Sequence, residues 1–509
     1  MSKKTKSIVS TTIVITILTM CFKLLGFVKQ AVVAYFFGTT FYTDVYYLAF
    51  NFVGMLGSAF IRAITISMVS IYTNCLIQKG KDEASKLISA CLEILVPVVL
   101  AVMLLAYALT PQIAHMLAPD YTPEKALLLQ HYLQLCFPFF LFAVVTLVWT
   151  TMFDANKDFV AGRTESFTTS VTTILCCIFL HGVLQAGTTL VIAQYCSYVI
   201  FGLFLIIRGR RYFKFTLVPL RDVPEIKTVL LTAIPLFIGN SVSQINKIVD
   251  GALAAGLGDG KATSLSNSAM LEDFVTVILV NNVVDVLYVN FSIYTANKDY
   301  DKLVEIMKKA INIMICIMIP ITIVTCICSR EIVSIAYERG AFGAESVDMT
   351  KAALVGYAAG FASMGIRDII LRGLYSFKNT KTTMITGIIS VLINIVLSIV
   401  LSHNMGIMGI TLASSISLTV NFLINSQMLK RHIPNYHITS HIPVLLKQIP
   451  AVVYTLAVVL LVKHYVSGNI IVFLLSAILG LGGYGLILMF MKVEEVDYIK
   501  EKLLAKLKR

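Results

Sequence analysis

Apolar runs of about 20 residues or more, separated by short polar stretches, fill nearly the whole of this chain. A helix of about 20 apolar residues is long enough to cross the hydrocarbon core of a membrane. The runs are too long for membrane β-strands, and a backbone in lipid must satisfy its own hydrogen bonds, so they predict helices. Only 14% of the 509 residues are charged, whereas a soluble protein has about 25%. The sequence therefore predicts an all-α polytopic membrane protein.

The spacing of these runs predicts about fourteen transmembrane helices in two lobes. The expected spans are residues 8–37, 42–73, 84–110, 127–153, 159–181, 186–208, 228–257, 262–296, 302–328, 348–377, 380–402, 405–430, 444–465 and 468–491. A long basic connection after the sixth span suggests two six-helix lobes and an added helix pair, a common plan in transporters. The expected parts are an N-terminal lobe (1–210), a cytoplasmic linker (211–225), a C-terminal lobe (226–432), the helix pair (433–492) and an amphipathic tail (493–509).

The distribution of charge, rather than the net charge of +13, indicates orientation. Most basic residues fall in every second connection, and the others hold only Lys125, Lys261, Arg330, Arg339, Lys351 and Lys463. This bias places the basic connections and both termini in the cytoplasm and argues against nucleic acid as a partner. The first run lacks a small-residue cleavage site and is expected to be retained. The tail is expected to lie on the anionic leaflet, or to be a solvated helical extension.

Six basic residues lie inside the predicted spans, namely Lys23, Lys29, Arg62, Lys247, Arg367 and Arg372. A cation in hydrocarbon costs roughly 2.5–3.5 kcal/mol on the most lenient scale, so such residues usually face a water-filled cavity or a partner. Acidic residues accompany them, namely Asp44, Asp250, Glu272, Asp273, Asp285 and Asp368. A charged interior of this kind favours a transporter.

Each charge in the first two spans has two interpretations. Lys23 and Lys29 flank Gly26 and are either cations that bind phosphate in a cavity or members of an internal ion pair, for instance with Asp44. Asp44 is either a cavity acid or a cap of its own helix. Arg62 faces the cavity or pairs with an acid such as Glu93.

The later spans carry similar alternatives. Lys247 and Asp250 either pair on their helix or form a polar stripe, and Asp285 lies one turn from Asn281 on a face expected to line a cavity. Asp368 and Arg372 are spaced to pair, which would leave Arg367 unmatched. The stretch 256–262 (Gly-Leu-Gly-Asp-Gly-Lys-Ala) lacks two positions of a phosphate loop and is interpreted as a turn.

Several motifs in register resemble the MviN/MurJ family of the MOP exporter superfamily. They are Leu25-Gly-Phe-Val-Lys29, Thr43-Asp44, Val242-Ser-Gln-Ile-Asn246 with Asp250, Glu338-Arg-Gly-Ala-Phe-Gly-Ala-Glu345, Leu392-Ile-Asn-Ile-Val396 and Gly406-Ile-Met-Gly409. The resemblance covers most of the chain, and the predicted number of spans fits the family.

The resemblance implies a flippase that moves an undecaprenyl-pyrophosphate-linked glycan, lipid II above all, to the outer leaflet of a bacterial plasma membrane by alternating access. It implies a cationic cavity between lobes, to which we assign Lys23, Lys29, Arg62, Arg367, Asp44 and Asp285. The last two helices would form a groove for the lipid tail. The expected partners are the lipid-linked glycan and membrane lipids, with the protein a monomer.

Departures from the family pattern keep other cargoes open. Gly57-Ser58 stands where the family has two arginines, Met270 stands near the place of another arginine, and Gln30 stands where an acid usually follows the second cation. A capsule or exopolysaccharide lipid-linked oligosaccharide is therefore the alternative substrate. A drug/cation antiporter is less favoured because its cavity should be acidic, and an enzyme is less favoured because no loop can hold a catalytic domain.

The resemblance also implies a sodium site on the seventh, eleventh and twelfth spans. Asp250, Asn394, Ser398 and Ser414 would match it, with Ser398 standing where some members have an acid. Sodium is thus the one possible cofactor, as a coupling ion.

Overall fold

The regular structure of the computed structural model is entirely helical in the part of the chain that it describes, with no strand in that part. It describes residues 3–156, 158–210, 212–213, 215–219, 223–377 and 379–495, except for some side chains within helices. The helices are α1 (Lys3–Phe37), α2 (Phe41–Gln78), α3 (Lys81–Ala108), α4 (Thr110–Leu117), α5 (Pro123–Cys136), α6 (Pro138–Ala155), α7 (Phe159–Leu180), α8 (Ala186–Gly209), α9 (Glu225–Gly256), α10 (Lys261–Val275), the π-helical η2 (Thr276–Asn281), α11 (Asn282–Ala296), α12 (Tyr300–Ile327), α13 (Ser329–Tyr337), α14 (Ala344–Ala358), α15 (Phe361–Ser376), α16 (Thr380–Met405), α17 (Ile407–His432), the 3-10 helix η3 (Ile438–His441), α18 (Ile442–Tyr465) and α19 (Asn469–Phe490).

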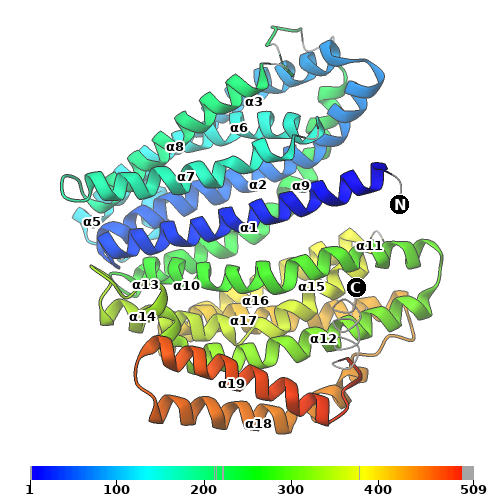
Figure 1. Cartoon of the computed structure of the whole chain (residues 1–509). Helices are drawn as coiled ribbons and strands as arrows, with labels where there is room; N and C mark the ends of the chain where they lie inside the picture. The colour runs from blue at the N-terminus through cyan, green and yellow to red at the C-terminus, as the bar shows by residue number, and fades with distance from the viewer. Residues whose placement is uncertain are drawn as a thin grey trace. The chain divides into compact units, whose positions relative to one another are not determined.

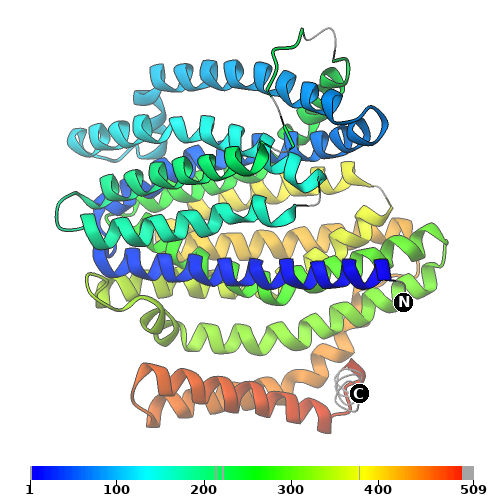
Figure 2. The ribbon, with the colours of Figure 1, turned by 45° about the horizontal axis from the view of Figure 1, so that its top comes forward.

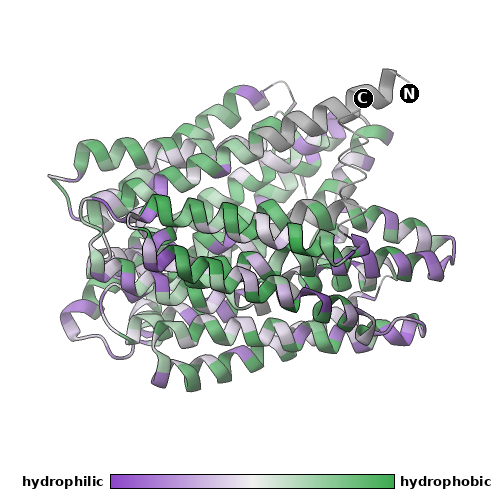
Figure 3. Ribbon diagram, turned by 60° about the horizontal axis from the view of Figure 1, so that its bottom comes forward, coloured by the Kyte–Doolittle hydropathy of each residue, from purple (hydrophilic) through white to green (hydrophobic). Residues whose placement is uncertain are grey.

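The predicted membrane class is confirmed by the length and apolarity of these helices. Ten of the described spans are long and apolar enough to cross a membrane, or eleven if the bent pair α14–α15 counts as one. The other predicted spans correspond in chain order to α7, α9 and the run from α10 to α11. Figure 3 shows hydrophobic residues along most of the helices, with hydrophilic residues gathered near many helix ends and connections.

Contacts divide the chain into two units, of which the first contains Met1–Thr263 and the short segment Gly340–Phe342. Within it α1 packs on α7, α7 on α8, and α2 on both α6 and α9. The close packing of α9 on α2 brings this helix into the first unit, whereas the sequence suggests a boundary at the linker 211–225. The six-plus-six division into lobes stays a prediction.

Local sequence explains where several helices of the first unit begin. A capping box forms at the start of α2, where the Thr40 hydroxyl accepts from the Thr43 backbone and the Thr43 side chain accepts from Thr40. Proline stands in the first turn of α4, α5 and α6, where its missing N–H is not needed. Pro138 thereby separates α5 from α6 inside one predicted span.

The second unit contains Ser264–Arg339 and Gly343–Arg509. In it α17 packs against α14, α15 and α16, and α12 packs against α15 and α18. The orange-to-red helices α18 and α19 lie side by side as a pair in both Figure 1 and Figure 2. α14 and α15 meet at a bend of 43°.

Candidate functional site

The two cations of α1 differ in their surroundings. Lys23 is exposed, whereas Lys29 is half-buried against α7, with the Cys177 thiol among its neighbours. No hydrogen bond or ion pair joins either ammonium group to another residue in the described part of the chain. Lys29 is thus a partly desolvated cation without a counter-charge there, which is an arrangement suited to an anionic ligand.

A neutral residue occupies the place beside Lys29 where a carboxylate could have neutralised it. Gln30 is only 7% exposed, and its side-chain amide donates a 2.7 Å hydrogen bond to the hydroxyl of Tyr47 on α2. This bond satisfies a buried polar group and joins α1 to α2 without adding negative charge next to Lys29.

Asp44 is engaged at the start of another helix. Its carboxylate accepts hydrogen bonds from the backbone N–H groups of Gly260 (2.5 Å) and Thr263 (2.7 Å) and from the Thr263 hydroxyl (2.6 Å). A negative charge at the N-terminus of a helix is favourable, and the fully buried Asp44 therefore caps α10. The alternative that Asp44 caps its own helix is wrong, because Thr40 does so.

The stretch that resembles a phosphate loop is a turn, as expected from its missing positions. It joins α9 to α10, with positive φ at Gly258 (117°) and Gly260 (83°), a conformation that glycine adopts without strain. The turn presents the Gly260 amide to Asp44.

Two predicted site residues, Arg62 and Asp285, have side chains outside the described part of the structure. Glu93, the alternative partner of Arg62, accepts a 3.0 Å hydrogen bond from the backbone of Val218. Together with the bond from Thr216 N–H to the Ser89 hydroxyl (3.2 Å), it fastens the segment after α8 to α3.

On α15 the predicted pairing is wrong. Asp368 pairs with its neighbour Arg367, whose Nε and Nη2 donate to Oδ1 at 2.9 and 2.6 Å. The guanidinium of Arg372 instead lies 5.5 Å from the centre of the Tyr288 ring, a cation–π contact. Because both Nε and Nη2 of Arg367 reach one carboxylate oxygen, this arginine is not the unmatched charge.

The residues proposed for sodium fall in both units. In the first unit Asp250 is buried and accepts a 3.3 Å hydrogen bond from Asn246, while the predicted partner Lys247 is exposed and forms no ion pair with any described residue. In the second unit Asn394 donates to Ser414 (3.0 Å) and accepts from Ser398 (3.4 Å). Within the second unit the structure thus brings Asn394, Ser398 and Ser414 together. No cluster of three or more His, Cys, Asp or Glu suited to a metal occurs among the described residues.

A family model described as "Lipid II flippase MurJ" matches residues 33–480, which is most of the helical body. The chain belongs to the MurJ family. Curated relatives named "Probable lipid II flippase MurJ" include those of Treponema pallidum (22% identical, covering 86% of this chain and 85% of the relative) and Rickettsia prowazekii (22%, covering 89% and 90%).

Solved structures extend the family assignment to the fold. "Lipid II flippase MurJ, inward closed conformation" superposes with a TM-score of 0.80 at 22% identity, covering 94% of this chain and 98% of that one. An inward-facing multidrug resistance MATE transporter of the MOP superfamily gives 0.70 at 13% identity, covering 81% and 94%. This MurJ-family chain therefore has the fold of the MOP exporters.

Sequence reasoning missed the partners of its own candidate residues. No sequence pattern selects Thr263, which hydrogen-bonds to Asp44, or Tyr47, which hydrogen-bonds to Gln30. A Thr three positions after Gly260 is a weak signal of a helix start, but nothing in the sequence links it to Asp44.

Proposed function

We propose that this MurJ-family protein is a lipid II flippase, which moves a polyprenyl-diphosphate-linked glycan from the cytoplasmic to the outer leaflet without converting it chemically. The observation that carries the proposal is the family match across residues 33–480. The helical body is that of a multi-pass membrane protein, and we place it in the plasma membrane of a bacterium, as a monomer with both termini in the cytoplasm.

The negative charge of a diphosphate headgroup suits the surroundings of Lys29 in the first unit. A diphosphate carries negative charge that cannot enter hydrocarbon alone, and the half-buried Lys29 offers a cation that no described carboxylate neutralises. Lysine acts as a compact point charge toward phosphate. Lys29 would hold the diphosphate while the protein alternates between access to the two leaflets.

The apolar surface of the α18–α19 pair suits the long polyprenyl tail of the lipid. Large apolar side chains are exposed on both helices, among them Leu460, Leu461, Ile470 and Ile478. In a membrane such a surface contacts acyl or polyprenyl chains. We propose that the pair carries the long lipid tail.

A second cargo, a capsule or exopolysaccharide lipid-linked oligosaccharide, is favoured by the altered α2. Gly57-Ser58 occupies the place of the family's arginine pair, and the Ser58 hydroxyl bonds only to the Met55 carbonyl of its own helix as far as the described contacts go. Complementation decides between the two cargoes. A strain depleted of its lipid II flippase should grow when this protein is expressed; failure to grow, with rescue of a strain lacking a capsule flippase, would assign the second cargo.

Sodium is proposed as the coupling ion. The oxygen atoms of Asn394, Ser398 and Ser414 and the carboxylate of Asp250 are hard ligands of the type that such cations prefer. Replacing sodium by choline should slow transport, and Asp250→Asn should remove that dependence; a rate independent of sodium would reject the coupling.

A further inference from the structure

The Asn312 side chain of α12 hydrogen-bonds to one residue just before α18 and to another just after α19. Asn312 lies 2.6 Å from Nδ1 of His441, just before α18, and its amide donates to Glu495, just after α19, at 2.5 Å. Their exposed fractions are 1%, 4% and 8%. Because an ionised carboxylate only accepts, Asn312 presents its N–H₂ to Glu495 and its oxygen to the N–H of His441. Asn312 therefore bridges three segments.

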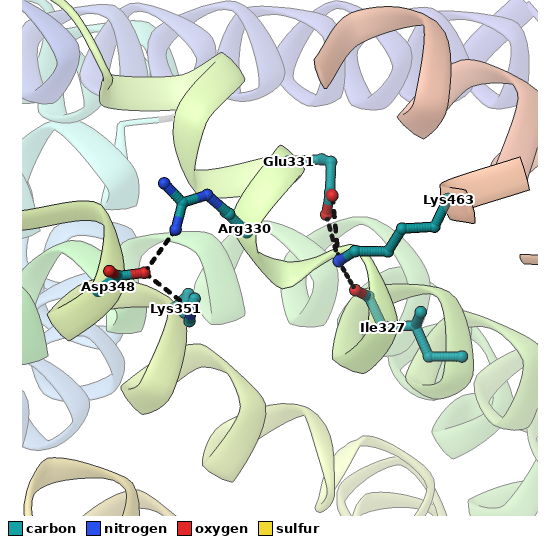
Figure 4. A network of polar contacts seen from close by, with 6 residues as sticks. All are labelled: Ile327, Arg330, Glu331, Asp348, Lys351 and Lys463. Carbon is teal, nitrogen blue, oxygen red and sulfur yellow. Dashed lines mark hydrogen bonds and ion pairs between the residues drawn. The ribbon is translucent and has the colours of Figure 1, made fainter. Parts of the chain in front are cut away.

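A second polar attachment lies at the C-terminal end of α12, whereas Asn312 is near the middle of that helix (Figure 4). The Lys463 ammonium, in the last turn of α18, donates to the carbonyl of Ile327 at 2.7 Å and pairs with Glu331 at 3.0 Å. Ile327 is the last residue of α12 and Glu331 is buried in the first turn of α13. A lysine on terminal carbonyls satisfies the end of a helix. The attachments at Asn312 and Ile327 are about 22 Å apart along α12.

Buried contacts continue between the two attachments. Gln448 of α18 accepts from the Tyr484 hydroxyl of α19 at 2.5 Å and donates to the Cys316 thiol of α12 at 3.4 Å. Nearer to Ile327, the Ser476 side chain of α19 lies against the thiol of Cys328. All of these side chains are buried. The pair therefore contacts α12 from its middle, at Asn312, to its C-terminal end.

We propose that Asn312 and Lys463 are positioning residues that fix the α18–α19 pair to α12, so that the three helices move as one body during transport. Loss of Asn312 leaves a buried carboxylate and a buried imidazole without their partner, which favours release of the pair. This inference rests on the proposed function, because it concerns the helices that would carry the lipid tail.

A reversible disulfide between α19 and the residue that follows α12, called the lock below, tests the inference. In Ser476→Cys, the new thiol replaces the hydroxyl that neighbours the native Cys328, and a disulfide between these two residues is the intended lock. Oxidation with copper phenanthroline, followed by mass spectrometry of the linked peptides, shows whether the lock forms. Transport is then read from the lipid II that an impermeant probe can reach, before and after reduction. The matched control, Cys328→Ser with Ser476→Cys, cannot form this lock and reports effects of oxidant on the other cysteines.

The locked Ser476→Cys protein should transport as the reduced one does. Asn312→Leu in the same background should transport more slowly when reduced and recover when locked, a rescue that a general folding defect would not show. If Asn312→Leu does not reach the membrane, Lys463→Met is combined with Ser476→Cys instead, with the same expected result. If the Ser476→Cys protein loses transport on oxidation and regains it on reduction, the inference is overturned. It is overturned equally if Asn312→Leu in that background transports normally when reduced, or if oxidation does not restore its transport. A chain inactive in every state would instead count against the proposed function.

Discussion

At the scale of single residues, environment decides which intramembrane charges are available to a ligand. Arg367 is engaged by Asp368 and Asp44 by the start of α10, whereas Lys29 is half-buried beside the neutral pair Gln30 and Tyr47. The sequence identified all of these as unusual charges, but their roles depend on which neighbours the fold supplies.

The capping role of Asp44 can be measured as stability. Asp44→Ala leaves the buried amides of Gly260 and Thr263 without an acceptor, at a cost of about 1–3 kcal/mol. We expect a lower thermal unfolding temperature in detergent, with Thr263→Ala and the double variant showing less than additive losses. The exposed Asp82→Ala serves as the control. Additive effects, or an Asp44→Ala protein as stable as the parent, would contradict this role.

The sequence could not have predicted that contact. Asp44 and Gly260 are 216 positions apart, and the local signal Thr43-Asp44 favours a cap of the nearer helix equally well. The pairing on α15 failed for a similar reason, since i,i+4 spacing permits the pair Asp368–Arg372 but does not exclude competition from the adjacent Arg367.

At the scale of elements, hydropathy predicted where the chain crosses the membrane and missed how the crossings are interrupted. Each predicted span has a helix or a run of helices in the structure. The break at Pro138, the bend between α14 and α15 and the π-helical turn η2 lie inside apolar runs, where hydropathy does not change. The short α13 was missed because nine residues are too few to form a span.

The connection between α13 and α14 depends on a glycine. Gly340 has φ of 60°, and an added Cβ would lie 2.3 Å from the Tyr35 carbonyl of α1, beside the 2.8 Å bond from Ala341 N–H to the same oxygen. Gly340→Ala should therefore destabilise the first unit by at least about 1 kcal/mol, seen as a lower unfolding temperature. Gly343, around which a Cβ would meet no atom within 4 Å, is the matched control. Equal stability of the two alanine variants would refute the requirement.

At the scale of the whole molecule, the family's fold is kept although the sequence has diverged. The TM-score of 0.80 to a MurJ structure accompanies 22% identity, so the helices persist although most side chains differ. The sequence motifs identified the family correctly, as the match over residues 33–480 shows. They could not identify the cargo, because Gly57-Ser58 stands where the resemblance leads us to expect two arginines.

The central claim is that Lys29 binds the diphosphate of lipid II as it crosses the membrane. The direct measurement is the amount of lipid II that an impermeant probe reaches in cells depending on this protein alone, compared between the parent, Lys29→Gln and the exposed control Lys81→Gln. Loss of a charge-assisted hydrogen bond of about 1.5–3 kcal/mol predicts a decrease of roughly 10- to 100-fold for Lys29→Gln and none for Lys81→Gln. Parental accessibility in Lys29→Gln, at equal protein level in the membrane, would contradict the claim.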